Sequence, residues 1–196
     1  MHKSEVKWVL GSASPRRKQI LEAMGYSFTT RVADIDETAP PQLSGEKTVE
    51  YIAAQKAAAL LPHLEIDEVL ITSDTEVWMD SQRFGKPKNP EEAIAMLKRL
   101  SGKTHKVISG ICLTDKKSQR TGHETTFVTF RELSLKEIEY YVSKHNPLDK
   151  AGAYGIQEYI GMIGIEKIEG NYFNVVGLPT FTLHRLQQEY LASKSQ

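Results

Sequence analysis

Short apolar runs alternate along this chain with longer segments in which apolar residues recur every three or four positions. The short runs are typical of buried strands, and the longer segments are typical of amphipathic helices. Two strand-like runs, 104–115 and 121–133, flank the polar segment 116–120, which predicts a long antiparallel pair. Interleaved strands and helices with such a hairpin predict an α/β fold, with a mixed central sheet flanked by helices.

The expected elements follow one another without internal repeats, low-complexity tracts or clear linkers. We therefore expect a single domain over residues 1–196, a length sufficient for one sizeable core. The expected strands are 6–10, 27–33, 68–74, 76–79, 84–87, 104–115, 121–133 and 162–170. The expected helices are 15–24, 46–61, 89–102, 134–144 and 179–193, and 171–179 is expected to form a structural corner.

Composition and charge exclude several classes of protein. The 25 Lys and Arg residues balance 25 Asp and Glu residues, which argues against a broad basic surface for nucleic acid. The single Cys112 excludes an internal disulfide and a multi-cysteine zinc site. No run approaches the ~20 apolar residues of a membrane span, and the first residues lack the apolar stretch of a signal peptide. We therefore expect a cytoplasmic protein that contacts neither nucleic acid nor membrane.

The segment GSASPRRKQILEAMG, residues 11–25, reads as the start of a helix with an unusual charge pattern. Ser14 suits the N-cap position and a proline follows it. Arg16, Arg17 and Lys18 then crowd the first turn, where the helix dipole is already positive. Each cation there costs roughly 0.3–1 kcal/mol.

A multiply charged anion would reverse that penalty. The free N–H groups, the helix dipole and the arginines all attract phosphate oxygens. Ser12 and Ser14 add hydroxyl donors. The alternative is a solvated basic helix end. On the anion hypothesis, we expect Arg17→Ala to leave the ligand-free stability level or slightly higher.

Phosphate chemistry usually needs a hard cation held by carboxylates. One acidic cluster, residues 34–37, follows an expected strand, and Asp74 ends another. Asp34 is better explained as a turn residue. The apolar flanks of Asp74 favour a partly buried carboxylate, which needs partners. Lys86, after the expected hairpin, is a further candidate for a phosphate contact.

Lys56 lies on the apolar side of the expected helix 46–61. Spacing alone favours a lysine whose ammonium reaches out to water. The alternative is a lysine that belongs to the substrate-binding set.

The segment DKAGAYGIQ, residues 149–157, is rich in small residues that allow backbone to approach a ligand closely. Gln157 at its end could present an amide to a nucleobase. An ordinary tight connection explains the segment equally well.

Seven segments in order resemble the Maf family of nucleotide pyrophosphatases: SASPRR, DIDET, SDT, GKP, SGKTH, DKAGAYGIQ and NVVGLP, between residues 12 and 179. The resemblance implies a cytoplasmic enzyme, often a homodimer, that hydrolyses nucleoside triphosphates to monophosphate and pyrophosphate with Mg²⁺ or Mn²⁺. It also implies an elongated fold of the Maf and ITPase type with its active site in a cleft.

Carried over residue by residue, the resemblance implies Asp74 as the general base and Glu37 as an acidic site residue. We expect these two carboxylates to hold the metal. Arg17, Thr75 and Gln157 match positions tied to substrate choice. The expected substrate-binding residues are Ser12, Arg16, Arg17, Lys18, Lys56, Thr75, Lys86 and Gln157.

The triplet GIQ resembles the branch of the family that acts on dTTP and UTP. One alternative is the branch that acts on 7-methyl-GTP. The other is a nucleotide-binding regulator of septum formation with little turnover.

The chain departs from the family pattern at SDTEVW, where aliphatic residues usually follow the Asp-Thr pair. On a strand, Asp74 and Glu76 face the same side. Glu76 is therefore expected to join the metal site, to perturb the ionisation of its neighbour, or to point to water if a bulge intervenes.

Overall fold

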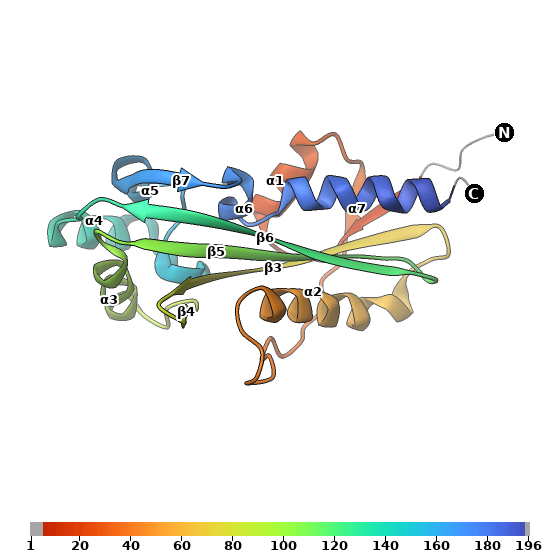
Figure 1. Ribbon diagram of the computed structural model, residues 1–196, viewed down its shortest axis with the longest axis horizontal. Coiled ribbons are helices and arrows are strands. Elements are labelled where there is room, and N and C mark those ends of the chain that lie inside the picture. The colour runs from red at the N-terminus through yellow and green to blue at the C-terminus, as the bar shows by residue number, and fades with distance from the viewer. Residues whose placement is uncertain (1–5, 195–196) are drawn as a thin grey trace. The chain divides into compact units, whose positions relative to one another are not determined.

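The computed structural model describes residues 6–194. Within them, seven strands form one mixed sheet in the order β2-β1-β3-β5-β6-β7, with β4 paired to β3 (Figure 1). β1 runs parallel to β2 and β3, whereas β4 is antiparallel to β3 and β7 is antiparallel to β6. The predicted mixed α/β architecture is confirmed. The strands are β1 (Lys7–Leu10), β2 (Phe28–Thr30), β3 (Glu68–Met79), β4 (Gln82–Phe84), β5 (Thr104–Thr114), β6 (Gln119–Phe130) and β7 (Ile165–Glu169).

The helices Pro90–Leu100 and Leu135–His145 each begin with a side-chain cap. Asn89 accepts a hydrogen bond from the Glu92 N–H at 2.8 Å, and Ser134 forms a capping box with Glu137. Among the described residues, no helix is both long and apolar enough to cross a membrane. The helices are α1 (Pro15–Ala23), α2 (Glu46–Leu60), α3 (Pro90–Leu100), α4 (Leu135–His145), α5 (Tyr159–Gly164), α6 (Tyr172–Val176) and α7 (Thr180–Ser193).

The chain divides into two compact units. Unit 1 contains the residues up to Asp74, then 109–124, then those from Gly177 onward. Unit 2 contains 75–108 and 125–176. β3, β5 and β6 each contribute residues to both units.

In unit 1, helices α2 and α7 lie on opposite sides of the strands (Figure 1). The two helices approach the strands at glycines. A Cβ on Gly110 of β5 would overlap the backbone of α2, coming within 2.7 Å of the Glu50 nitrogen. A Cβ on Gly122 of β6 would lie 2.7 Å from Thr182 of α7. Glycine is therefore required where each helix packs. The core beside α2 consists of Val9, Ala53, Ala57, Leu60, Leu64, Leu70 and Cys112.

In unit 2, one larger core is built by α3, α4 and the unit 2 portions of the three long strands. His105 lies inside it, stacked on Phe130 at 5.6 Å and bonded to the Tyr154 hydroxyl at 2.7 Å. Burial lowers the pKa of His105 to about 4, so the ring is neutral at physiological pH. The core residues are Val77, Met79, Phe84, Ala93, Leu97, Leu100, Val107, Val128, Phe130, Ile138, Tyr141, Val142, Ala153, Tyr154, Ile156 and Ile160.

β3 is one strand where the sequence predicts two, 68–74 and 76–79. The polar residues at the expected break have partners inside the fold. Thr72 donates to the Ala53 carbonyl and Ser73 donates to the Gly110 carbonyl, both at 2.7 Å. These bonds satisfy the hydroxyls, so the strand continues through the polar stretch.

Four other expected elements differ in the structure. β4 covers Gln82–Phe84 instead of the expected 84–87, because the tight turn at residues 80–81 pairs Met79 with Gln82. β2 covers only Phe28–Thr30 of the expected strand 27–33. Residues 162–164 belong to helix α5, in which the Met162 N–H donates to the Glu158 carbonyl at 3.0 Å. The expected corner 171–179 contains helix α6, whose first turn is closed by a 2.9 Å bond from the Phe173 N–H to the Asn171 side chain.

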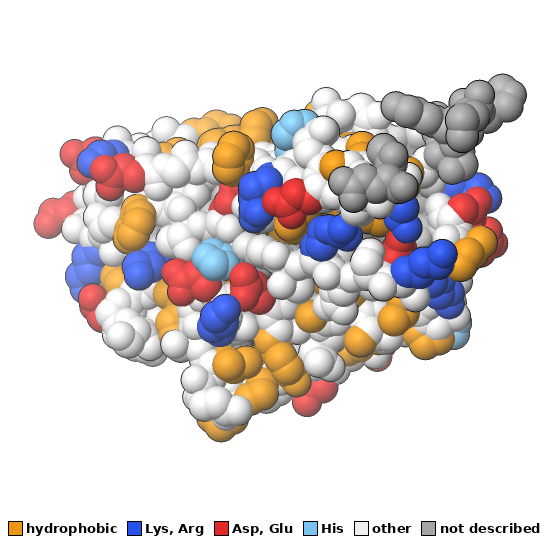
Figure 2. Space-filling view, turned by 45° about the vertical axis from the view of Figure 1, so that its right-hand side comes forward, with side chains coloured by type: hydrophobic (Ala, Val, Ile, Leu, Met, Phe, Trp, Pro, Cys, Tyr) orange, Lys and Arg blue, Asp and Glu red, His pale blue; other side chains and the backbone are white. Residues whose placement is uncertain are grey.

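Lys and Arg side chains are interspersed with Asp and Glu side chains on the described part of the face in Figure 2. This mixing agrees with the balanced composition of the chain.

The close approach at Gly110 generates a stability prediction. We expect Gly110→Ala to lower the free energy of unfolding by about 3 kcal/mol, because the new methyl group overlaps the backbone of α2. Gly85→Ala is the control, since a Cβ there has open space around it. Chemical denaturation of both variants measures the difference. Equal stability of the two variants would show that α2 can move away from β5 at little cost.

Candidate active site

The carboxyl end of β1 lies at an edge beside the unit 1 portion of β3, and β3 itself continues to Met79 in unit 2. The parallel register places Leu10 beside Ile71, and the Gly11 N–H donates to the Ile71 carbonyl at 2.8 Å. The loop after β1 therefore starts next to the residues that follow Ile71 on β3. In α/β proteins, functional groups commonly lie in loops beyond the carboxyl ends of strands.

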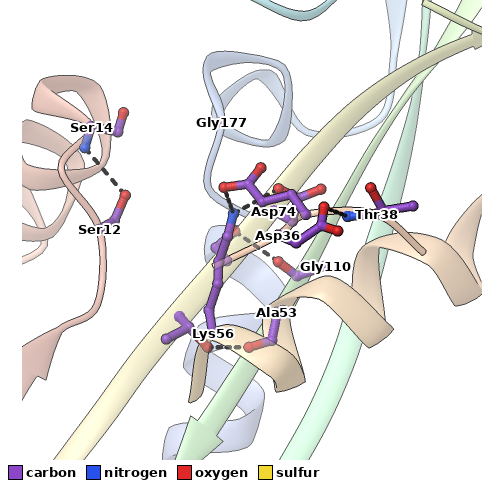
Figure 3. Close-up of polar contacts among 12 residues, drawn as sticks. Ser12, Ser14, Asp36, Thr38, Ala53, Lys56, Asp74, Gly110 and Gly177 are labelled. Carbon is purple, nitrogen blue, oxygen red and sulfur yellow. Dashed lines mark hydrogen bonds and ion pairs between the residues drawn. The ribbon is translucent and has the colours of Figure 1, made fainter. Parts of the chain in front are cut away.

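The first turn of α1 starts from this edge, in the loop after β1. Ser14 caps the helix and accepts from the Arg17 N–H at 3.4 Å. The Ser12 hydroxyl accepts from the Ser14 N–H at 3.2 Å (Figure 3) and from the Arg17 guanidinium at 3.2 Å. Ser12 thus links the loop backbone to the side chain of the second arginine.

The Arg17 side chain is hydrogen-bonded within the fold and also lies near two carboxylates. Its Nε donates to the Gly177 carbonyl at 2.8 Å. Burial lowers the pKa of the Arg17 guanidinium, the charges of Asp74 and Glu37 raise it, and the charge of Arg16 lowers it. The side chain therefore lies in the field of two carboxylates and a second arginine.

These contacts change the expectation for Arg17→Ala. The guanidinium binds a carbonyl and a hydroxyl within the folded chain. Removing it leaves the Gly177 carbonyl, on a buried residue, without this donor, so the variant is now expected to lose ligand-free stability instead of keeping it.

Lys56 reaches from α2 into the same region (Figure 3). Its ammonium lies 2.8 Å from Asp74 Oδ1 and 3.1 Å from Glu37 Oε1. The spacing-based preference for a lysine that points to water is wrong, because its side chain is only 13% exposed. The reason is a tertiary ion pair that helical periodicity cannot reveal.

Asp74 and Glu37 thus meet at one ammonium although 37 positions separate them in the sequence. The Asp74 side chain is 9% exposed and that of Glu37 is 45% exposed, so one is buried and one faces solvent. Converging carboxylates attract a hard cation. Mg²⁺ is commonly bound by one or two carboxylates together with water and substrate phosphates.

The carboxylates of Asp74 and Glu37 suit such an ion only if further ligands complete its coordination shell. Across residues 6–194, no three His, Cys, Asp or Glu side chains gather as a ready metal site. Two carboxylates leave several octahedral positions for phosphate oxygens and water. The side chains therefore suit a metal that arrives with its substrate more than a resident ion.

Glu76, two residues beyond Asp74 on β3, has separate partners in unit 2. Its side chain is 2% exposed, which rules out the reading in which it points to water. One oxygen accepts from Trp78 Nε1 at 2.8 Å, and the other lies 2.8 Å from Arg83 Nε. Both oxygens are engaged, so this geometry does not support a metal-ligand role for Glu76.

Four of the remaining predicted residues are placed as follows. Lys18 is exposed and lies 3.9 Å from Glu22 on its own helix. Thr75, Lys86 and Gln157 all belong to unit 2. Lys86 is exposed, and Gln157 is partly buried. Among the described residues, the Gln157 side-chain oxygen is buried and has no hydrogen-bond partner.

Sequence reasoning missed the groups that hold these side chains. The Gly177 carbonyl is a backbone atom 160 positions from Arg17 and leaves no mark in a side-chain pattern. The sequence does contain a signal for the role of Arg83 as a partner of Glu76. Arg83 stands directly opposite Trp78 in the β3–β4 hairpin, and a cation there can reach a carboxylate one diagonal step away.

Comparison with known proteins gives a consistent result. A family model described as "Maf-like protein" matches residues 7–190. Proteins named "dTTP/UTP pyrophosphatase" are similar over most of their length. The Phocaeicola vulgatus protein is 49% identical (91% of this chain, 93% of that protein), and the Flavobacterium johnsoniae protein is 42% identical (95% and 94%).

Among solved structures, the Ham1 protein of Staphylococcus aureus matches this chain with a TM-score of 0.46 and 13% identity. The match covers 63% of this chain and 71% of that chain. A likeness of this size carries no argument about function.

The Lys56 ion pair predicts a stability change. We expect Lys56→Met to lower the free energy of unfolding by about 2 kcal/mol, because it leaves the buried Asp74 carboxylate without its cationic partner. Chemical denaturation of the variant and of the wild type measures this loss.

Lys18→Met is the matched control, since its pair with Glu22 is exposed and worth about 0.5 kcal/mol or less. A loss in Lys56→Met that is no larger than in the control would show that the ion pair is not a stabilising contact.

Proposed function

Since this chain belongs to the Maf family, we propose that it is a nucleoside triphosphate pyrophosphatase that converts dTTP and UTP to their monophosphates and pyrophosphate. The observation that carries the proposal is the meeting of Asp74 and Glu37 at the Lys56 ammonium, at 2.8 Å and 3.1 Å. The names of the similar proteins support the choice of substrates.

The cations supply the substrate affinity in this proposal. Lys56 contacts both carboxylates, Arg17 lies in their field with the charge of Arg16 nearby, and the start of α1 adds backbone N–H groups. A triphosphate brings several negative charges, which turn the repulsion between the two arginines into attraction for the ligand. Ser12 orients Arg17, and Lys18 and Lys86 are proposed as outer phosphate contacts.

Glu37 and Asp74 would hold Mg²⁺ or Mn²⁺ together with phosphate oxygens. The ion supplies charge neutralisation at the phosphates when it is bound. The Lys56 ammonium keeps the two carboxylates paired in the ligand-free protein. This pairing prevents their mutual repulsion from opening the site before substrate arrives.

Asp74 acts as the general base. It orients a water molecule and accepts its proton as the water oxygen bonds to the α-phosphorus. The bond from that phosphorus to the bridging oxygen breaks, and pyrophosphate leaves with the bonding electrons. The cations of the site stabilise the charge that develops on the leaving group.

Gln157 and Thr75 are proposed to set the choice of base. The amide of Gln157 offers one acceptor and two donors, and thymine and uracil present carbonyl acceptors beside an N3–H donor. Its buried oxygen has no partner among the described residues, so binding an N3–H would satisfy it. Cytosine presents an amine in place of one carbonyl and fits this pattern less well.

The Maf resemblance also supports one catalytic domain made by the whole chain, a cytoplasmic location and a homodimer. Light scattering of the purified protein tests the dimer. A monomer that retains full activity would remove it from the proposal.

The central test compares two carboxylates two residues apart. We expect Asp74→Asn to lower kcat for dTTP by roughly 10²–10⁴-fold, the effect of losing a general base. Glu76→Gln is the matched control and keeps most of its activity, because Trp78 and Arg83 hold that carboxylate elsewhere. Pyrophosphate release with Mg²⁺ is the measurement.

Four outcomes would contradict the proposal. Orthophosphate as the first product, or full activity in excess chelator, excludes the metal-dependent pyrophosphatase reaction. Loss of activity in Glu76→Gln but not in Asp74→Asn moves the base to the other carboxylate. Tight nucleotide binding without turnover favours a regulator.

Base selection gives a second prediction. We expect wild-type kcat/KM to be highest for dTTP and UTP, with CTP roughly tenfold lower or more, because a buried amide left with a wrong partner is costly. Gln157→Glu should reduce this preference, since a carboxylate removes both amide donors. Preference for 7-methyl-GTP, or a profile that the substitution leaves unchanged, would contradict the assignment.

A further inference from the structure

The loop from residue 149 to residue 158 in unit 2 carries Gln157 and is held in a constrained shape. Gly152 and Ala153 both have positive φ, at 68° and 60°, a region that Ala rarely occupies. The Gly152 N–H donates to the Gly85 carbonyl at 3.1 Å, and the Ala153 N–H donates to the Lys150 carbonyl at 3.1 Å. Such a backbone persists only when surrounding contacts enforce it.

Those contacts converge on the carboxylate of Glu158. The Tyr141 hydroxyl of α4 donates to one of its oxygens, and the Lys150 ammonium lies 3.1 Å from the other. The same hydroxyl accepts from the Gly155 N–H at 3.0 Å. One tyrosine therefore fixes the backbone on one side of Gln157 and the side chain on the other.

This network is packed inside the protein. Tyr141 is fully buried and the Lys150 side chain is 9% exposed. A Cβ on Gly155 would lie 2.8 Å from the Glu158 carboxyl carbon, so the loop backbone rests against that carboxylate. Burial and the neighbouring carboxylate raise the pKa of Tyr141, so its hydroxyl keeps the proton that it donates.

Gln157 differs from its neighbours in this network. Its side-chain oxygen is buried and has no hydrogen-bond partner among the described residues, whereas Tyr141 and Lys150 both bind Glu158. The loop thus holds a buried polar atom ready for a ligand, between two points that Tyr141 fixes.

We propose that Tyr141 and Glu158 are positioning residues that set base selectivity by fixing the loop beneath Gln157. They act through Gln157 and do not contact the nucleotide. The inference rests on the proposed function for its ligand, a thymine or uracil nucleotide. It adds two specificity-determining residues to that site.

The test is a double-mutant cycle. We expect Tyr141→Phe to raise KM for dTTP roughly tenfold with little change in kcat, and to lower the preference for dTTP over CTP by a similar factor. In a Gln157→Ala background the same substitution should leave the preference unchanged, because its effect passes through Gln157.

Tyr140→Phe is the matched control, because Tyr140 is the neighbouring residue on α4 and is 50% exposed. Glu158→Gln, compared with the exposed Glu139→Gln, repeats the test from the other end of the network. Equal losses for all nucleotides, or additive effects of Tyr141→Phe and Gln157→Ala on the preference, would overturn the inference.

Calorimetric binding of dTMP and CMP separates this inference from the proposed function. If wild type releases no pyrophosphate but prefers dTMP, and Tyr141→Phe removes that preference, the pyrophosphatase proposal fails and the positioning role stands. If wild type binds dTMP and CMP equally, Gln157 selects no base and the positioning role fails. If turnover is confirmed and Tyr141→Phe keeps the full preference, only the positioning role fails.

Discussion

The close packing of α2 on β5 is the constraint on which the candidate site in unit 1 depends. Gly110 has no side chain, so the backbone of α2 can lie directly against the strand. The Thr72 hydroxyl then reaches the Ala53 carbonyl of the helix at 2.7 Å. Lys56, three residues further along α2, comes within 2.8 Å of Asp74. A larger residue at position 110 would push the helix away and separate this ion pair.

The sequence predicts local structure well wherever a short-range signal controls it. Ser14 caps its helix as expected, and the expected helices 89–102 and 134–144 become α3 and α4. The expected long pair 104–115 and 121–133 becomes β5 and β6, neighbours in the sheet. The errors arise where a residue distant in the sequence determines the position of a side chain. Helical spacing cannot show that Lys56 meets a carboxylate 18 positions away.

The site itself was predictable in part and for a similar reason. Cations on the positive end of a helix indicate a nearby negative charge, and the structure supplies part of it from Asp74 and Glu37. The sequence does not show that Arg17 is also anchored on the Gly177 carbonyl. Contacts within the fold therefore offset part of the electrostatic cost of placing cations at the start of α1. The triphosphate that we propose as ligand would offset the rest.

Asp74 and Glu76 show how partners separate the roles of two similar side chains. Trp78 donates its indole N–H to one oxygen of Glu76, Arg83 from the same hairpin forms an ion pair with the other, and only 2% of the Glu76 side chain is exposed. Asp74 instead shares one flexible ammonium with the more exposed Glu37. A lysine shared in this way can turn toward an arriving phosphate and leave Asp74 to bind water or metal, because its flexible stem allows the ammonium to move. Glu76 is already paired with Trp78 and Arg83 of its own hairpin, which supports our proposal that Asp74 is the general base.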